Sequence, residues 1–295
     1  LLLIGLLTLY WHSSRKHPTV ADLIYYPVKS CAGIHALEAE ITETGIKHDR
    51  CWAVMELPNR IVTQKKDPRL GRVQPHLLFD DTGKPAKMTL RYPGFAPCEI
   101  SLKDTAVAEL ISCTFFDSEC LVYEQSPKAR EWFRTVLNAD YLLVFQFSHR
   151  KALEAKPSSA ELLDPTEALT FADQLQLLVA SEESYKRLVS ELPEPKADNI
   201  SMDCFRPNII LKNSAAFVED TWKAFVINGV SFKVVDRCER CAVTTINPKT
   251  LEFDRYREPI KTLARINGDG KFGYFGIVVN RLNSGVIAVG NRLSF

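Results

Sequence analysis

The sequence lacks several features that would assign it at once to a protein class. Its formal net charge of +1 argues against a generally basic nucleic-acid binder. Its eight cysteines are irregularly spaced and do not form the dense disulfide framework of a small secreted domain, so we expect mostly reduced thiols. It has no internal repeat and no low-complexity tract. A hydrophobic content of 46% with 25% charged residues is typical of a globular protein with a sizeable core.

Motifs for common metal and nucleotide sites are also scarce. All six histidines lie at or before His149, and Cys238-x-x-Cys241 is the single Cys-x-x-Cys pair, whereas structural zinc needs four ligands. Residues 268–273 fit the Gly-x-Gly-x-x-Gly pattern, but they are expected to form a turn that enters a strand, which is not the strand–turn–helix context of dinucleotide folds. No flavin motif and no iron–sulfur cysteine cluster is visible. Redox chemistry on this chain would therefore need electrons from outside it.

A short apolar run opens the chain. Residues 1–11 (LLLIGLLTLYW) would span about 16 Å as a helix, short of the roughly 30 Å hydrocarbon layer of a bilayer. No small-residue cleavage site follows Trp11, which argues against a signal peptide, although a buried helix remains an alternative. Because the chain opens on leucine, we expect residues 1–19 to be a truncated membrane anchor with a basic flank. Arg15 and Lys16 then predict that the globular part faces the cytosol.

Short apolar stretches predict a β-rich chain with few helices. One helix is expected after Ser126, with Pro127 at its first position, and another from about Ser181 to Pro193. Residues 151–166 are polar and are expected to form a linker or loop. Such a pattern is typical of a barrel-like β architecture with peripheral helices. Strands are predicted over residues 20–26, 36–41, 51–57, 61–63, 88–92, 99–102, 108–113, 121–123, 141–147, 209–211, 230–235, 242–246, 274–279 and 286–289.

The motif Cys238-Glu239-Arg240-Cys241 is the most informative stretch. It stands at the edge of the β-branched run 242–246, expected to be a strand, which would hold a thiol rigidly. A neighbouring cation favours the thiolate, the form that binds soft metals. Inert core thiols, a structural zinc site and a thioredoxin-like pair remain alternatives. The last of these usually opens a helix, which the run 242–246 does not predict.

Further cations stand at the edges of predicted strands, in the stretches Tyr26-Pro27-Val28-Lys29-Ser30, His48-Asp49-Arg50-Cys51-Trp52 and Phe205-Arg206-Pro207-Asn208. Each arginine taken alone could be a solvated charge or part of a surface ion pair, and Asn208 could cap a turn. Together, one thiolate and several scattered cations indicate a site for an anionic, metal-bearing cofactor.

These four stretches, in this order, resemble the MOSC-domain molybdenum enzymes, and in particular the mitochondrial amidoxime-reducing component family, over about residues 20–295. The resemblance implies a mixed α/β, β-rich fold. It implies a MOSC-type β-barrel over residues 148–295 and an N-terminal β-rich companion region over 20–147, whose first strands contribute to the cofactor site. Peripheral helices complete this fold.

The resemblance also implies the molybdenum cofactor (Mo-molybdopterin), with Cys241 as the metal ligand and Cys238 as its neighbour. Asp173 could relay a proton, because reduction of an N–O bond releases water, or it could orient backbone amides in a loop. The further positions that match cofactor contacts of the family are Lys29, Ser30, Arg50, Arg206, Asn208, Glu239 and Arg240.

Some positions depart from the family pattern. Glu239 stands where a serine is usual, Gln174 and Leu175 follow Asp173 where a Thr-Ser pair is usual, and Phe275 replaces a cofactor-contacting tyrosine, although Tyr274 adjoins it. These changes bear on local cofactor contacts and substrate preference more than on the metal ligand.

The activity that the resemblance implies is reduction of small N-hydroxylated substrates, such as amidoximes and hydroxylamines, to amidines and amines. Electrons would come from cytochrome b5 and NADH-cytochrome b5 reductase, with the protein anchored in the mitochondrial outer membrane and its catalytic domain facing the cytosol. Two alternatives stay open. One is a non-catalytic cofactor-binding or sulfur-transfer MOSC module, as in molybdenum-cofactor sulfurase. The other is a membrane-tethered interaction domain with structural zinc.

Overall fold

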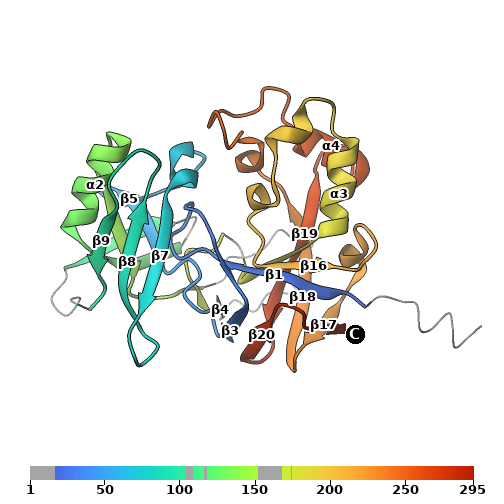
Figure 1. Cartoon of the computed structure of the whole chain (residues 1–295), viewed down its shortest axis with the longest axis horizontal. Coiled ribbons are helices and arrows are strands. Elements are labelled where there is room, and N and C mark those ends of the chain that lie inside the picture. The colour runs from blue at the N-terminus through green and yellow to red at the C-terminus, as the bar shows by residue number, and fades with distance from the viewer. Residues whose placement is uncertain (1–16, 104–108, 116–117, 152–167, 174) are drawn as a thin grey trace, which may run out of the picture.

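The computed structural model describes residues 17–103, 109–115, 118–151, 168–173 and 175–295. Figure 1 shows that the elements from the first half of the chain gather mainly on one side and those from the second half on the other. Strand β1 (Thr19–Tyr25) departs from this division, because it lies among the C-terminal elements and pairs with β16 (Ile209–Lys212). Segments nearly two hundred residues apart in sequence are thus joined in one sheet.

Five strands from the first half of the chain close into a barrel. Its interior is packed with apolar side chains that include Met55, Phe115, Val122 and Phe171. In barrel order the strands are β10 (Leu110–Phe115), β11 (Ser118–Glu124), β12 (Tyr141–Gln146), β5 (Trp52–Glu56) and β6 (Arg60–Val62).

A three-stranded antiparallel sheet and one helix complete the N-terminal half. The helix α2 (Pro127–Leu137) contacts β12 and β9, and its apolar stripe is buried as the spacing predicts. Pro127 occupies its first turn as predicted, and the side chain of Ser126 makes no capping hydrogen bond. The sheet consists of β7 (Gln74–Phe79), β8 (Pro85–Arg91) and β9 (Cys98–Ser101).

An eight-stranded sheet forms the C-terminal half and curls back on itself. Thr19 of β1 forms an antiparallel bridge with Arg292, and the Leu293 amide donates to the Pro18 carbonyl over 2.9 Å, so the last strand returns to the first. In order, the strands are β2 (Ile34–Ala36), β1, β16, β15 (Leu177–Ser181), β19 (Tyr274–Arg281), β18 (Val230–Glu239), β17 (Ala224–Ile227) and β21 (Leu293–Ser294). The smaller sheets are β20 (Gly285–Ala288) with β3 (Glu38–Thr42) and β4 (Gly45–Ile46), and β13 (Arg150–Lys151) with β14 (Ala168–Leu169).

Helices lie beside this sheet. The helix α3 (Glu182–Glu191) begins at Ser181, whose Oγ accepts hydrogen bonds from the Glu183 and Ser184 amides over 3.2 Å, and it ends before Pro193 as predicted. It contacts α4 (Ile260–Ile266), a helix that the sequence pattern did not predict. The short 3₁₀ helices are η1 (Pro68–Arg72), η3 (Lys196–Asn199), η4 (Met202–Phe205), η5 (Val218–Thr221) and η6 (Ala242–Thr245).

One predicted strand is wrong in a place that matters. Residues 242–245 form the 3₁₀ helix η6 instead of a strand, despite their β-branched composition. The hydroxyl of Thr244 donates to the Cys241 carbonyl over 3.0 Å, and that of Thr245 donates to the Ala242 carbonyl over 2.8 Å. Such local side-chain bonds compete with strand pairing and tighten the turn.

The β-rich architecture with a barrel and peripheral helices is confirmed. The expected anchor falls almost wholly on residues 1–16, and the expected linker on 152–167, both outside the described residues. In the part of the chain that the structure describes, no helix combines the length and apolar character needed to cross a membrane.

Candidate functional site

Cys241 is an exposed residue at a turn whose backbone is hydrogen-bonded on both sides. Strand β18 ends at Glu239, and the Arg240 amide then donates to the Gly273 carbonyl over 3.0 Å beside the start of β19. Cys241 follows as the residue that precedes the first turn of η6. All eight cysteines lie in the described part of the chain, and Cys241 is the one that is exposed. Accessibility and a fixed backbone are what a metal-binding thiolate needs.

Arg240 is directed at the other cysteine of the motif. Its Nη1 donates to Cys238 Sγ over 2.9 Å, and its Nη2 donates to the Phe205 carbonyl over 2.8 Å. Burial raises the pKa of the Cys238 thiol, and the guanidinium of Arg240 opposes that rise. Arg240 therefore bonds directly to Cys238, and its expected effect on the neighbouring Cys241 stays a prediction.

The ring of Tyr26 supports two arginines. The Arg206 guanidinium lies 4.1 Å from the ring centroid and that of Arg50 lies 4.7 Å from it. The Tyr26 hydroxyl donates to the Pro207 carbonyl over 3.1 Å, which ties the ring to the segment that carries Arg206. Cation–π attraction of this kind offsets part of the cost of burying the charges. Tyr26 was not predicted as a site residue, although it opens the Tyr-Pro-Val-Lys-Ser motif.

Arg50 is paired within the protein. Asp49, 1% exposed, accepts from the Tyr26 amide over 2.7 Å and from Arg50 Nη1. Burial works against the charge on Arg50, but Asp49 more than compensates and raises the pKa of the guanidinium. The Asn208 amide joins strands, donating to the Ile24 carbonyl over 3.1 Å and accepting from the Leu178 amide over 3.2 Å. Asn208 Oδ1 also lies 3.4 Å from Arg50 Nη1, so it helps to orient that arginine.

Lys29 and Asp173 form an ion pair at the edge of the site. Lys29 is 5% exposed, and its Nζ donates to the Phe171 carbonyl over 2.9 Å and to Asp173 Oδ1. Burial lowers the pKa of Lys29, and Asp173 opposes that effect. Desolvation raises the pKa of Asp173, but Lys29 outweighs it and the net pKa is lowered, even though 65% of the side chain is exposed. This geometry favours an ionised partner of Lys29 over a strong proton donor.

Ser30 connects the motif to the barrel. Its backbone adopts a left-handed conformation with φ of 67°, and its Oγ accepts from the Gln64 amide over 3.3 Å. The Gln64 side-chain amide donates back to the Ser30 carbonyl over 2.7 Å. Gln64 follows β6, so this pair of bonds fixes the Lys29–Ser30 turn against the N-terminal half.

The cationic residues from distant parts of the chain act on one another. Arg50 and Arg206 both contribute to the lowered pKa of Lys29. Asp173 and Cys241 both contribute to the raised pKa of the Cys238 thiol. The structure thus brings the four sequence motifs into one electrostatic cluster. We name Lys29, Arg50, Arg206 and Arg240 the cationic cluster.

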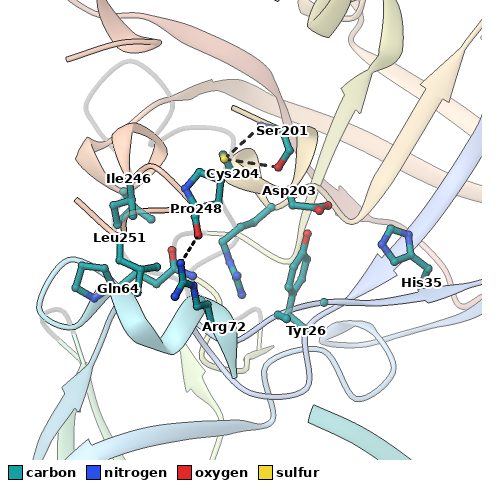
Figure 2. A pocket seen from close by; sticks show the side chains of 16 residues that line it. Tyr26, His35, Gln64, Arg72, Ser201, Asp203, Cys204, Ile246, Pro248 and Leu251 are labelled. Atoms are coloured by element: carbon teal, nitrogen blue, oxygen red, sulfur yellow. Dashed lines mark hydrogen bonds between the residues drawn. The ribbon is translucent and has the colours of Figure 1, made fainter. Parts of the chain in front are cut away.

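A cavity of about 240 Å³ adjoins this cluster and lies between the two halves of the chain. Arg206 and Tyr26 line it from one direction, and Val243 and Ile246 line it near η6. Figure 2 shows Arg72 beside Pro248, where Arg72 Nη2 donates to the Pro248 carbonyl over 3.1 Å across the boundary between the halves. The other labelled lining residues in that view are His35, Gln64, Ser201, Asp203, Cys204 and Leu251.

Comparison with known families assigns both halves of the chain. Residues 17–140 match the MOSC N-terminal beta barrel domain, and residues 166–294 match the MOSC domain. The chain belongs to the MOSC family. The resemblance seen in the sequence is confirmed at this level.

Curated relatives agree with that assignment. Mitochondrial amidoxime reducing component 2 of Bos taurus is 29% identical over 249 residues, which cover 83% of this chain and 71% of the relative. Mitochondrial amidoxime-reducing component 1 of Homo sapiens is 29% identical over 286 residues, covering 92% and 81%. Molybdenum cofactor sulfurase of Solanum lycopersicum is 28% identical over 267 residues, covering 86% of this chain but 32% of the relative. These relatives support a molybdenum-related MOSC function at the family level.

Two buried arginine nitrogens test whether the MOSC site suits an anionic cofactor. Arg206 Nη2 and Arg240 Nε are both inaccessible to solvent, and neither has a hydrogen-bond partner among the described residues. A buried, unpaired donor costs about 1–3 kcal/mol, so natural proteins rarely keep one without a role. Oxygen-rich anionic groups would accept from both. The donors present therefore fit the cofactor that the family implies.

The residues that depart from the family pattern differ in their burial and in their packing partners. Phe275 is fully buried and packs against Phe205 in a tilted arrangement with the ring centroids 4.1 Å apart, so it belongs to the core beside α3 and α4. Tyr274 packs under the guanidinium of Arg237 at 4.0 Å, and Glu239 is opposite Tyr274 in the β18–β19 ladder. Leu175 is partly buried, and Gln174 lies outside the described residues.

Within the described residues, no group of three or more histidine, cysteine, aspartate or glutamate side chains is arranged to hold a metal ion.

Proposed function

We propose that this chain is a molybdenum-cofactor-dependent oxidoreductase that reduces N-hydroxylated compounds such as amidoximes and hydroxylamines. The observation that carries the proposal is the exposed Cys241 thiol beside a cationic cluster that retains two unpaired buried donors. The names of the relatives support the substrate class, because several are amidoxime-reducing components.

In this proposal Cys241 supplies the one thiolate that the protein gives to molybdenum. Arg206 and Arg240 donate to anionic groups of the cofactor, and Lys29 and Arg50 add positive charge. Ser30 and Asn208 hold the segments that carry these cations, and Glu239 is the adjoining residue at the end of β18. When bound, the cofactor would supply the two-electron chemistry that reduces an N–O bond.

The protein residues then control charge and protons. Reduction of an N–OH group to N–H with release of water consumes two electrons and two protons, so the site needs a path from solvent. Asp173 is exposed and keeps Lys29 charged despite its burial. Its lowered pKa means that it is ionised at neutral pH and has no proton to donate, so its main role in this proposal is to hold the proton on Lys29 Nζ.

The electron supply and the location are proposed from the family. Cytochrome b5 and NADH-cytochrome b5 reductase would deliver electrons from NADH. Residues 1–19 would anchor the protein in the mitochondrial outer membrane with the MOSC domains facing the cytosol, and the relatives' names support a mitochondrial location.

A second candidate is a cofactor-binding or sulfur-transfer module, because molybdenum cofactor sulfurase matches most of this chain. One experiment separates the two. The purified chain is analysed for molybdenum and then supplied with benzamidoxime and a reduced dye as the electron donor. Bound molybdenum with formation of benzamidine supports the reductase. Bound molybdenum without turnover supports the module, and zinc or no metal contradicts both.

A further inference from the structure

Two cysteines face each other inside the N-terminal barrel. Cys113 of β10 and Cys120 of β11 are directly opposite in the antiparallel ladder, and their Sγ atoms lie 3.1 Å apart. Residues directly opposite in such a ladder have Cα atoms about 4.5–5.5 Å apart, within the range that disulfides span. An S–S bond is about 2.05 Å long, so the two sulfur atoms need to approach by about 1 Å.

The strand that carries Cys113 lies at the weakest seam of the barrel. Strand β10 has six register pairs with β11 but, among the described residues, one with β6, between Thr114 and Arg60. Local opening follows such weakly paired seams, because few hydrogen bonds must break. Cys113 is fully buried and Cys120 is 3% exposed, so opening at this seam is the route by which a reagent would reach them.

A chain of contacts joins this pair to the cationic cluster. Phe115 lies two residues after Cys113 and therefore on the same face of β10. Its ring lies 4.5 Å from Lys29 Nζ and packs edge-on against Phe171 at 6.1 Å. The Phe171 carbonyl in turn accepts the hydrogen bond from Lys29 Nζ. A shift of β10 would therefore move the Phe115 ring and Phe171, and through these two contacts it would change the position of Lys29 Nζ.

We propose that Cys113 and Cys120 are a redox-active dithiol that forms a reversible cross-strand disulfide, and that its formation is transmitted through Phe115 to Lys29. The oxidant is a low-molecular-weight disulfide. One cysteine thiolate attacks a sulfur of the oxidant, forms a mixed disulfide and releases one thiol. The second cysteine thiolate attacks that mixed disulfide, which closes the protein S–S bond and releases the second thiol. The protein loses two electrons and two protons, and the oxidant is reduced to two thiols.

Formation of the disulfide does not depend on the proposed function. Only the consequence for cofactor binding, through Lys29, rests on the proposed function. Thiol mapping of the full-length native chain tests the disulfide. After treatment with glutathione disulfide and alkylation, we expect a peptide cross-linked between Cys113 and Cys120, and recovery of both thiols after dithiothreitol. In Cys113→Ala, Cys120 is expected to stop at the glutathione mixed disulfide. Cys98, which is 2% exposed, serves as the internal control: it should form no disulfide and be alkylated as a free thiol.

Hydrogen–deuterium exchange tests the transmission to Lys29. The Lys29 amide donates to the Trp52 carbonyl over 2.8 Å and the Phe171 amide donates to the Arg50 carbonyl over 2.9 Å, so both are protected reporters. Oxidation should shift exchange at both amides. The matched control is the Cys113→Ala/Cys120→Ala variant treated in the same way, which keeps Cys241 and reveals any shift caused by its modification.

Two results would overturn the proposal. The first is that Cys113 and Cys120 remain fully alkylatable after oxidation of the native chain, whatever happens to Cys241. The second is an exchange shift of equal size in the native chain and the double variant. That result would show that the disulfide does not cause the change at Lys29. The mapping needs no variant, so it decides the disulfide even where the double variant is too unstable to use.

Discussion

Arg240 donates to the sulfur of Cys238 over 2.9 Å, although its neighbour in sequence is Cys241. The two cysteines of one motif therefore have different surroundings. Cys238 is partly buried and held by a guanidinium, whereas Cys241 is exposed at the start of η6. The metal-binding role that we propose for Cys241 depends on this difference.

The role of Cys238 as the partner of Arg240 predicts a contrast between two substitutions. Cys238→Ser keeps an acceptor for Arg240 Nη1 and should keep most activity and molybdenum content. Cys238→Ala leaves that donor without a partner and should destabilise the fold by about 1–3 kcal/mol, measured by urea denaturation. Equal stability of both variants would show that the bond has no energetic role, and loss of molybdenum from Cys238→Ser would make Cys238 the better ligand candidate.

Arg206 is expected to control cofactor occupancy. Arg206→Ala removes a partly buried positive charge and the unpaired Nη2 donor, so molybdenum per purified chain should fall several-fold. Arg237→Ala is the matched control, because Arg237 also stacks on a tyrosine, Tyr274 at 4.0 Å. Full molybdenum occupancy in Arg206→Ala would show that Arg206 does not hold the cofactor. An equal loss of molybdenum in Arg237→Ala would indicate a general effect on folding.

The buried carboxyl of Glu219 predicts that the stability of the fold depends on pH. This effect does not involve the proposed cofactor site. Burial raises its pKa from the ordinary 4.5 to about 7, and the side chain is fully buried. The folded state thus holds this proton more tightly than the unfolded state does. Stability should therefore fall as the pH rises from about 4.5 to about 7 and level off above that, by roughly 3 kcal/mol in total.

Glu219→Gln removes this titration while keeping an acceptor for the Ser184 hydroxyl, which donates to Glu219 over 2.5 Å. The variant should gain stability relative to the native chain at pH 8 and gain little at pH 4.5. Denaturant midpoints at the two pH values measure this. The same difference at both would contradict the raised pKa.

The proposed electron supply predicts that NADH alone does not support turnover. The Gly-x-Gly-x-x-Gly stretch enters strand β19 and is followed by no helix, so the chain offers no dinucleotide fold there. NADH and benzamidoxime should give product after cytochrome b5 and its reductase are added together, and the rate should fall as salt rises. Product from NADH with neither partner present would contradict this prediction.

Local features were the most predictable from the sequence. The helices α2 and α3 were expected because Pro127, Ser181 and Pro193 mark their ends through short-range chemistry. The turn after Cys241 was missed because the hydroxyls of Thr244 and Thr245 bond locally and override their strand preference. Composition alone does not reveal where a threonine hydroxyl will bond.

The site residues were named from their motifs, but their mutual arrangement was not readable. The pairing of β1 with β16 and the ion pair of Lys29 with Asp173 join residues far apart in sequence, which depends on the whole fold. The direction of Arg240 and the role of the Tyr26 ring likewise depend on tertiary packing. Tyr26 and Asp49 could have been found, since both lie inside the motifs that drew attention to Lys29 and Arg50.

The most direct test of the central claim compares Cys241→Ser with the native chain. Both proteins are purified, analysed for molybdenum and assayed with benzamidoxime and a reduced dye. A neutral hydroxyl is a far poorer ligand for molybdenum than a thiolate. We predict about one molybdenum per native chain, and loss of turnover in Cys241→Ser with part of the cofactor retained through the cationic cluster. Full activity in Cys241→Ser, or a native chain that binds no molybdenum, would contradict the account.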